Sequence, residues 1–301
     1  MKKTYNKLDR ISISDRTFNI ILLVIVSIFL LIVLYPLIYV VSSSFSSGRA
    51  VTSGRVLLWP VEFSLDGYQI VFQHKAVWLG YANTIFYTIV GTLINMVLTI
   101  MTAYPLSRNT FQGKNLMTII FSIPMFFGGG LIPSFILMSN LNLVNTRTVM
   151  LLAGALSIYN MILMRTFFQS SIPNELLESA KIDGISDFNY LFRIVLPLSK
   201  AVISVIALYY LVDHWNAYFT AMIYLRNREL HPLQLVLREI LNSTKIDATM
   251  IGDSEILAKL TGAADVMKYA LIVVSTVPML ILYPCVQKFF EKGVMLGSVK
   301  G

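Results

Sequence analysis

The sequence predicts an all-α polytopic membrane protein with six transmembrane helices. Of its 301 residues, 56% are hydrophobic and only 13% are charged, about half the charged share of an ordinary soluble domain. The charges are unevenly placed: five long windows carry none, and a sixth, 201–225, carries only Asp213. Because a helix rises about 1.5 Å per residue, about 20 apolar residues cross a bilayer core. These features exclude most soluble enzymes.

The six apolar windows define the expected spans. We place them at 20–42, 81–104, 116–138, 148–168, 203–225 and 269–288. Transmembrane β-barrels are excluded, because their strands are segments of about 10 residues with alternating polarity. The first window follows lysines, as a secretory signal does, but its apolar run from Ile20 to Val41 exceeds the about 7–15 residues of a signal peptide. We therefore expect an uncleaved span after an N-terminal tail of residues 1–19.

The distribution of Lys and Arg predicts the orientation of the spans. With a cytoplasmic N-terminus, the inward segments carry 14 basic residues and a net charge of +7, and the outward segments carry 10 and a net charge of +2. This bias predicts that both termini are cytoplasmic, with a C-terminal tail at 289–301, an inward connection at 170–200 and an outer loop at 226–268. A basic chain can also bind nucleic acid. Here the basic residues only flank apolar runs, so we expect no nucleic-acid partner.

The third span contains helix breakers. Pro124 and Pro133 surround the three glycines 128–130, and the backbone groups that they free have to be satisfied inside protein or in a wet cavity. We expect a kinked or broken helix here. Close helix packing through small residues and the lining of a pathway both remain open.

The fifth span carries the polar residues of the membrane interior. Tyr209, Asp213, Asn216 and Thr220 are spaced by four, three and four residues, which places them on one face of a continuous helix. An intramembrane carboxylate is costly unless it is paired or solvated, so this face is a candidate for a translocation pathway, with Trp215 beside it, or for a lock between helices. No His, Cys or acidic cluster has the spacing of metal ligands, and we expect no metal.

The inward connection predicts two short helices that meet at Gly184. Pro173 suits a first turn, Gly184 suits a C′ position with positive φ, and Ser186 or Asp187 can cap a second helix. We expect the apolar residues of that second helix to share one face, and Pro197 to end it; these residues are Phe188, Leu191, Phe192 and Val195. Such a face on the cytoplasmic side requires a partner.

This connection resembles the EAA loop of membrane subunits of binding-protein-dependent ABC importers. The matching residues are Glu178-Ser179-Ala180, Gly184, Ile194 and Leu196-Pro197. Ser179 stands where the family has Ala, and Ala201 where many members have a second Pro. Other segments are similar to carbohydrate permeases, namely Tyr35-Pro36, Leu58-Trp59-Pro60, Ala103 to Arg108, His214-Trp215-Asn216 and the ending Lys292 to Gly301. The ending resembles the second permease subunit of maltose-type importers, in the branch that serves oligosaccharides and polysaccharide fragments such as alginate or rhamnogalacturonan.

The resemblance implies partners and roles. It implies a heterodimer with a second permease subunit, two ATPase subunits that bind ATP and Mg, an extracytoplasmic substrate-binding protein that meets the outer loop, and a carbohydrate substrate, an oligosaccharide, in a bacterial cytoplasmic membrane. The residues that it implies for coupling to the ATPase are Glu178, Ser179, Ala180, Asp183, Gly184, Ile194 and Pro197. Those that it implies for a tail contacting the ATPase are Gly297, Val299, Lys300 and Gly301.

The chain itself lacks the phosphate-binding motif G-x-x-x-x-G-K-[ST], since Gly113-Lys114 is followed by Asn115. We therefore expect no cofactor in this chain and no enzymatic activity, with alternating access driven by the partner ATPase. Two alternatives use Asp213 and His214: a secondary transporter with a proton relay, and a membrane-embedded enzyme with acid/base chemistry. Neither requires the helix–Gly–helix connection, so the importer is favoured. Several aromatic residues either stack on sugars or anchor the spans at the membrane interface; they are Trp59, Trp78, Trp215, Phe126 and Phe127.

Overall fold

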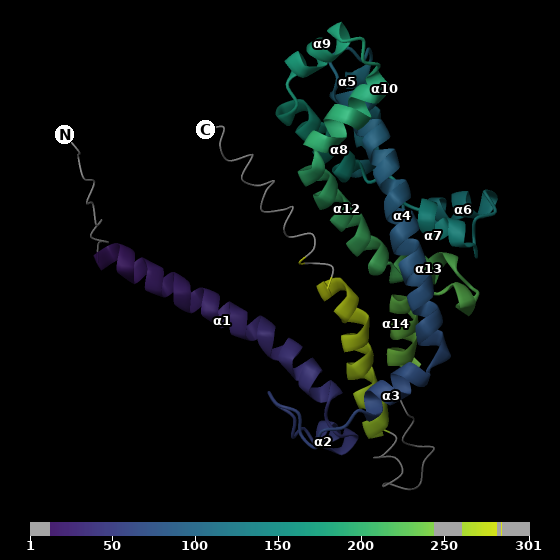
Figure 1. Ribbon diagram of the computed structural model, residues 1–301. Coiled ribbons are helices and arrows are strands. Elements are labelled where there is room, and N and C mark those ends of the chain that lie inside the picture. Colours follow the sequence, from purple (N-terminus) through teal and green to yellow (C-terminus); the bar gives the residue numbers. More distant parts are fainter. Residues whose placement is uncertain (1–12, 244–260, 282–283, 285–301) are drawn as a thin grey trace. The chain divides into compact units, whose positions relative to one another are not determined.

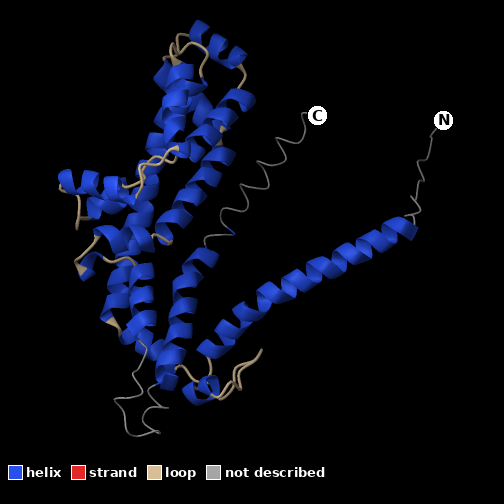
Figure 2. Ribbon diagram, turned by 180° about the vertical axis from the view of Figure 1, so that it is seen from behind, coloured by secondary structure: helices blue, strands red, loops and turns tan. Residues whose placement is uncertain are grey.

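A computed structural model describes residues 13–243, 261–281 and 284. Over these residues the chain consists of helices joined by loops, without a strand (Figure 2), which confirms the all-α fold. The described residues divide into two compact units, one of 13–71 with 261–273 and the other of 72–243 with 274–281 and 284. We describe each unit separately.

The first unit begins with α1 (Ile13–Ser44), which is apolar on every side. Most of its large side chains are exposed, as in Phe29 (65%) and Leu31 (67%), so the described residues of this unit leave them uncovered. Two short helices follow, α2 (Gly48–Thr52) and α3 (Asp66–Gln73). Ser47 caps α2, because its Oγ accepts a hydrogen bond of 3.2 Å from the Ala50 N–H.

Small residues allow close packing in this unit. A Cβ atom on Gly48 would lie 2.6 Å from the carbonyl carbon of Gly262, so only glycine permits this approach of two backbones. The surrounding core consists of Ala50, Val51, Val56 and Val266. The ring of Tyr39 on α1 packs edge to face on the ring of Tyr269, with centroids 5.7 Å apart.

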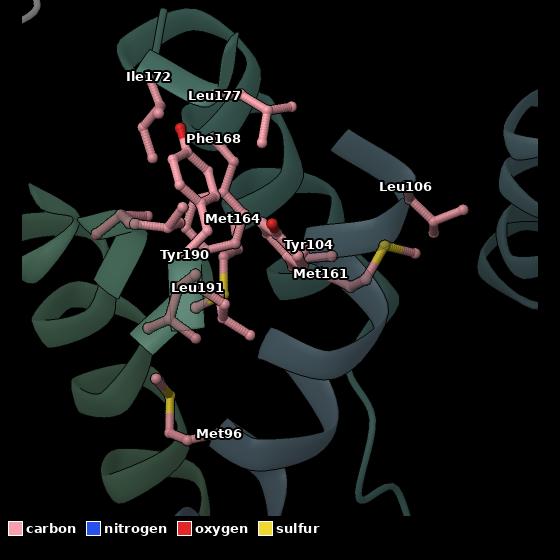
Figure 3. Close-up of a cluster of buried hydrophobic side chains, with 14 of the residues drawn as sticks. Met96, Tyr104, Leu106, Met161, Met164, Phe168, Ile172, Leu177, Tyr190 and Leu191 are labelled. Atoms are coloured by element: carbon pink, nitrogen blue, oxygen red, sulfur yellow. The ribbon is translucent and has the colours of Figure 1, made fainter. Parts of the chain in front are cut away.

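The second unit is built around α4 (Lys75–Ser107), a helix of 33 residues. It runs the length of the unit (Figure 1). The helices that contact it are α5 (Lys114–Phe126), α7 (Arg147–Leu152), α8 (Ile158–Ser171), α12 (Lys200–Trp215) and α14 (Leu233–Ser243). Near one end, large apolar side chains of α4 and α8 form a common core with the segment that follows α8 (Figure 3).

The third expected span is broken, as predicted. It consists of α5 and α6 (Leu131–Asn140), which are bent by 114° relative to each other. The break falls on the glycines rather than on the prolines: Pro124 lies within α5, and Gly130 adopts a left-handed φ of +83°. A residue with a Cβ would be strained there.

The fourth and fifth expected spans are also interrupted, which the sequence reasoning did not predict. Between α7 and α8 the chain turns at Gly154, whose φ is +77°, and α8 restarts where the Ser157 Oγ accepts a hydrogen bond from the Asn160 N–H. α12 ends at Trp215, and α13 (Tyr218–Tyr224) begins after two residues. There the Asn216 Nδ2 donates to the Val212 carbonyl at 2.9 Å and caps the end of α12. The prediction of two continuous helices was therefore wrong.

Length and composition identify three described helices that can each cross a membrane: Arg16–Ser44, Lys75–Ser107 and Thr261–Ile281. The number rises to five if α5 with α6, and residues 187–198 with α12, each count as one bent span. The count of six spans and the domain limits therefore stay predictions. The chain continues after α13 with a short 3-10 turn, η2 (Arg228–Leu230).

Candidate functional site

The segment between α8 and α12 is made of two helices that meet at a glycine. It contains α9 (Asn174–Ile182), α10 (Asp187–Tyr190), the π turn η1 (Leu191–Val195) and α11 (Leu196–Leu198). We call residues 173–198 the helix–Gly–helix segment. α9 and α10 lie at one end of the second unit (Figure 1). Pro173 precedes the first turn of α9, where its missing N–H costs nothing.

Gly184 closes α9 with two backbone hydrogen bonds. Its own N–H donates to the Lys181 carbonyl at 3.1 Å, and the Ile185 N–H donates to the Ala180 carbonyl at 2.9 Å. This pair of bonds is a Schellman motif, which needs a left-handed residue at the position of Gly184, and its φ is +71°. Ser186 then caps α10 by accepting a hydrogen bond of 3.4 Å from the Asn189 N–H. The Schellman motif fixes the direction in which the chain leaves α9.

The seven residues expected to couple the chain to an ATPase divide by exposure. Glu178, Ser179, Asp183, Gly184 and Pro197 are exposed, and Ile194 is half-buried. Ala180 is buried at 3% and packs in the core of the second unit. Beside the exposed acids, the apolar residues Ile182 and Phe188 are 87% and 71% exposed. The surface of the segment is thus mixed, with acidic and apolar side chains next to each other.

Two details of the second helix differ from the prediction. Leu191 and Val195 are buried, whereas Phe188 and Phe192 are exposed and pack on each other with ring centroids 4.6 Å apart. They therefore do not share one buried face, because the π turn shifts the angular position of the side chains. Nor does Pro197 end the helix: the π turn ends at Val195, Pro197 is the second residue of α11, and helical backbone continues to Leu198. The bend comes one residue later and measures 83°.

The predicted polar face of the fifth span is only partly formed. Tyr209 and Asp213 are exposed and line a hollow of about 590 Å³ together with Leu208, Val212, Met279 and Leu280. Asn216 is exposed at the end of α12, and Thr220 lies on α13, beyond the break. Trp215 is 4% exposed, and its Nε1 donates to the Ser275 carbonyl at 3.2 Å. It therefore packs inside the unit, away from the hollow.

Asp213 and His214 are neighbours in the sequence but lie in different environments. Asp213 is exposed, and His214 is 7% exposed. The His214 Nε2 lies 3.2 Å from the Asn95 Nδ2 on α4. His214 thus belongs to the contact between α12 and α4.

The four tail residues that are expected to contact the ATPase lie outside the described residues; they are Gly297, Val299, Lys300 and Gly301.

The sequence reasoning missed the polar face of α4. Asn83 donates through Nδ2 to the carbonyls of Glu229 and His231, at 2.7 and 3.1 Å. The Thr99 hydroxyl lies 2.8 Å from the Tyr210 hydroxyl on α12. The signal was available as Asn and Thr residues repeated at helical spacing; they are Asn83, Thr84, Thr88, Thr92, Asn95 and Thr99, all buried. This face holds α4 to its neighbours through hydrogen bonds.

Comparisons with known proteins agree with this architecture. A family model described as binding-protein-dependent transport system inner membrane component matches residues 95–296. The chain is 38% identical over 288 residues to the polygalacturonan/rhamnogalacturonan transport system permease protein YtcP of Bacillus subtilis (strain 168), with 95% of this chain and 99% of the relative covered. It is 37% identical over 270 residues to protein LplC of the same organism, with 90% of both covered.

A solved structure is also similar. It is the crystal structure of a bacterial ABC transporter involved in the import of the acidic polysaccharide alginate. One of its chains is 38% identical to this chain and aligns with a TM-score of 0.85, covering 93% of this chain and 98% of that chain.

Proposed function

The chain belongs to the family of binding-protein-dependent transport system inner membrane components, and from this premise we propose that it is a permease subunit of an ATP-driven importer of oligosaccharides. The observation that carries the substrate class is the similarity over nearly the full length to a polygalacturonan/rhamnogalacturonan permease and to a chain of an alginate importer. The proposed assembly contains a second permease subunit, two ATPase subunits that bind ATP and Mg, and an extracytoplasmic binding protein. Both termini are cytoplasmic in this proposal.

The helix–Gly–helix segment is the proposed contact with the ATPase subunit. Its exposed side chains include Glu178 and Asp183, and beside them Ile182 is 87% exposed. In the same segment Phe188 and Phe192 are exposed and pack on each other, and a group of exposed apolar side chains bordered by polar residues is typical of a surface that a partner covers. The buried Ala180 ties the same helix to the core of the second unit. A displacement of the segment by ATP-driven closure would therefore reach the spans, which favours alternating access. The tail residues Gly297, Val299, Lys300 and Gly301 are proposed to contact the ATPase as well.

Copurification and uptake test the proposal. The tagged chain, expressed with the genes of its neighbours, is expected to retain two ATPase subunits, a second permease and a binding protein. In proteoliposomes, ATP-dependent uptake is then measured for oligogalacturonides, rhamnogalacturonan fragments, alginate oligosaccharides and maltooligosaccharides. An assembly that retains no ATPase, or one that takes up none of these glycans, would contradict the proposal.

Substitutions of Gly184 test the coupling surface. A Cβ at this position meets no atom within 4 Å, so the cost is that of a left-handed backbone, about 1–2 kcal/mol for an ordinary residue and less for Asn. We expect Gly184→Asn to keep ATPase binding and uptake, and Gly184→Val to weaken both. Gly184→Asp adds a charge at the same surface and should reduce both as well. If Gly184→Val and Gly184→Asp bound the ATPase and supported uptake like the wild type, the coupling assignment would be wrong.

Asp213→Asn separates ATP-driven transport from a proton relay. Asp213 lines the exposed hollow of α12, and His214 lies in the buried contact with α4. We expect Asp213→Asn to leave ATP-driven uptake within about twofold of the wild type, since an amide preserves the volume and polarity of the group. Uptake driven by a proton gradient without ATP, abolished by the substitution, would favour a secondary transporter instead.

A further inference from the structure

Arg108 occupies an unusual position at the end of α4. It follows the last helical residue, Ser107, and is only 6% exposed. Its guanidinium carbon lies 5.1 Å from the centre of the Tyr104 ring and 5.9 Å from the centre of the Tyr190 ring. Tyr104 belongs to α4, whereas Tyr190 is the last residue of α10 in the helix–Gly–helix segment. The Arg108 guanidinium therefore contacts one aromatic ring on α4 and one on the helix–Gly–helix segment.

The surroundings of Arg108 show that the rings are its main partners. Its Nε donates to the Ser107 Oγ at 3.2 Å, and among the described residues it makes no ion pair with a carboxylate. A buried cation is costly unless its surroundings compensate for the lost water. Two aromatic faces provide such compensation, and a cation–π contact is strongest where water is excluded. The planar guanidinium also stacks on rings in a way that an ammonium group does not.

A second arginine, on the helix that precedes the segment, contacts the same end of α4. The Arg165 Nε on α8 donates to the Leu106 carbonyl at 3.0 Å. Leu106 is in the last turn of α4, where carbonyls lack partners within the helix. α8 leads into the helix–Gly–helix segment, and α10 lies within it. Contacts from both helices therefore attach the segment to the same end of α4. The Tyr104 hydroxyl adds a longer contact of 3.4 Å to the Asp187 carbonyl.

We propose that Arg108 is a positioning residue that fixes α10 to the cytoplasmic end of α4, so that a displacement of the helix–Gly–helix segment is passed to α4. This inference rests on the proposed function, because an ATPase partner is what moves the segment. α12 is joined to the segment by the chain itself through Ser199, whereas α4 depends on side-chain contacts. Other contacts also join the segment to α4, such as those of Arg165 and Tyr104, so loss of the Arg108 contacts should weaken the response of α4 more than that of α12.

The test uses the complete complex in nanodiscs and two thiol reporters. The single cysteine of the sequence, Cys285, is replaced by serine, and either Leu93→Cys on α4 or Val212→Cys on α12 is introduced, both at exposed positions. Maleimide labelling is timed with and without MgATP and vanadate. With Arg108 intact, we expect the labelling rate to change by about fivefold at both reporters. In Arg108→Gln, the change should be clearly reduced at Leu93→Cys and persist at Val212→Cys.

Companion variants separate positioning from folding. Tyr190→Phe keeps the ring and should respond like the unmodified chain, Tyr190→Leu should behave like Arg108→Gln, and Arg108→Lys should respond partially. Lys114→Gln is the matched control, because Lys114 is a basic residue that follows the same end of α4 and pairs with the Asn109 Oδ1 at the surface; it should respond normally.

Two results would overturn the inference. One is a normal response of Leu93→Cys in both Arg108→Gln and Tyr190→Leu. The other is an equal loss of response at both reporters, which indicates a general defect in folding. If Arg108→Gln does not assemble into the complex, the responses at Leu93→Cys in Tyr190→Leu and Tyr190→Phe test the inference in the same way. A failure of the proposed function is seen separately, because the chain with Arg108 intact would then retain no ATPase subunit.

Discussion

Gly91→Ala tests a close approach of α4 to His214 on α12. A Cβ atom at position 91 would lie 2.4 Å from the His214 Nε2 and 2.5 Å from its Cε1. Since nonbonded heavy atoms rest about 3.5 Å apart, the imidazole has to move by about 1 Å. His214 is 7% exposed and lies 3.2 Å from the Asn95 amide, so any such movement disturbs a buried hydrogen bond.

The expected magnitude follows from three contributions. Overpacking of a buried site costs about 1–3 kcal/mol, and loss of the hydrogen bond to Asn95 adds about 1 kcal/mol. Alanine is more favourable than glycine inside a helix by about 1 kcal/mol, which opposes both. We therefore expect Gly91→Ala to lower the free energy of unfolding by about 1–3 kcal/mol.

The assay is unfolding by SDS in mixed micelles, followed by tryptophan fluorescence and repeated in a His214→Ala background. Without the imidazole, the new methyl group meets open space, and the helix preference of alanine should raise the free energy of unfolding by about 1 kcal/mol. The sign of the effect is thus expected to reverse between the two backgrounds. Equal destabilisation in both would refute the steric argument.

Two further predictions concern the two units separately. Asn83→Leu leaves the carbonyls of Glu229 and His231 without their buried donor and should lower the free energy of unfolding by about 1–3 kcal/mol in the same assay. Asn83→Ala removes the same donor and should have a similar effect. An unchanged free energy of unfolding in both variants would contradict this role of the amide. In the other unit, the hydroxyl of Ser47 and a neighbouring arginine lower the pKa of Glu62 below its usual 4.5. A lowered pKa in the folded state stabilises above the unfolded pKa, and this stabilisation is lost as the pH falls through the folded value. The protection factors of amides around residues 47–62, which correct for the intrinsic slowing of hydrogen exchange in acid, should therefore fall below pH 4.5 in the wild type and depend less on pH in Glu62→Gln; identical pH profiles of the protection factor would contradict the assignment.

Local chemistry allowed much of this fold to be predicted from the sequence. The expected spans at 20–42, 81–104 and 269–288 overlap the three described helices that are long and apolar enough to cross a membrane, and the glycines at 128–130 indicated the break between α5 and α6. The family resemblance read from the Glu178 to Pro197 motif is confirmed by the family match. The turn at Gly184 was predictable because a Schellman motif depends on a few consecutive residues.

Features that depend on distant residues were not predictable in this way. The break at Asn216 requires the side chain to cap the preceding turn, and asparagine in an apolar run does not by itself show that it will do so. On the polar face of α4, Asn95 and Thr99 bond to His214 and Tyr210, more than 100 residues away, whereas the buried hydroxyls of Thr88 and Thr92 have no hydrogen-bond partner among the described residues. Arg108 entered the sequence reasoning as an inward basic charge and as part of the segment Ala103 to Arg108 that is similar to carbohydrate permeases; its contacts were not predicted, because the two aromatic rings around it meet only in the folded chain.

The π turn at Leu191–Val195 sets the direction in which the side chains of α10 point. Its bonds run five residues back, as from the Leu196 N–H to the Leu191 carbonyl, so this turn holds one residue more than an α turn. Five residues here complete the rotation that four complete in an ordinary helix, and the same sequence wound as a regular α-helix would turn everything before Leu191 by about 100° around the helix axis. The position of Tyr190 beside Arg108 thus depends on this turn. A change that restores regular α-helical bonding should separate the ring from the cation without altering either residue.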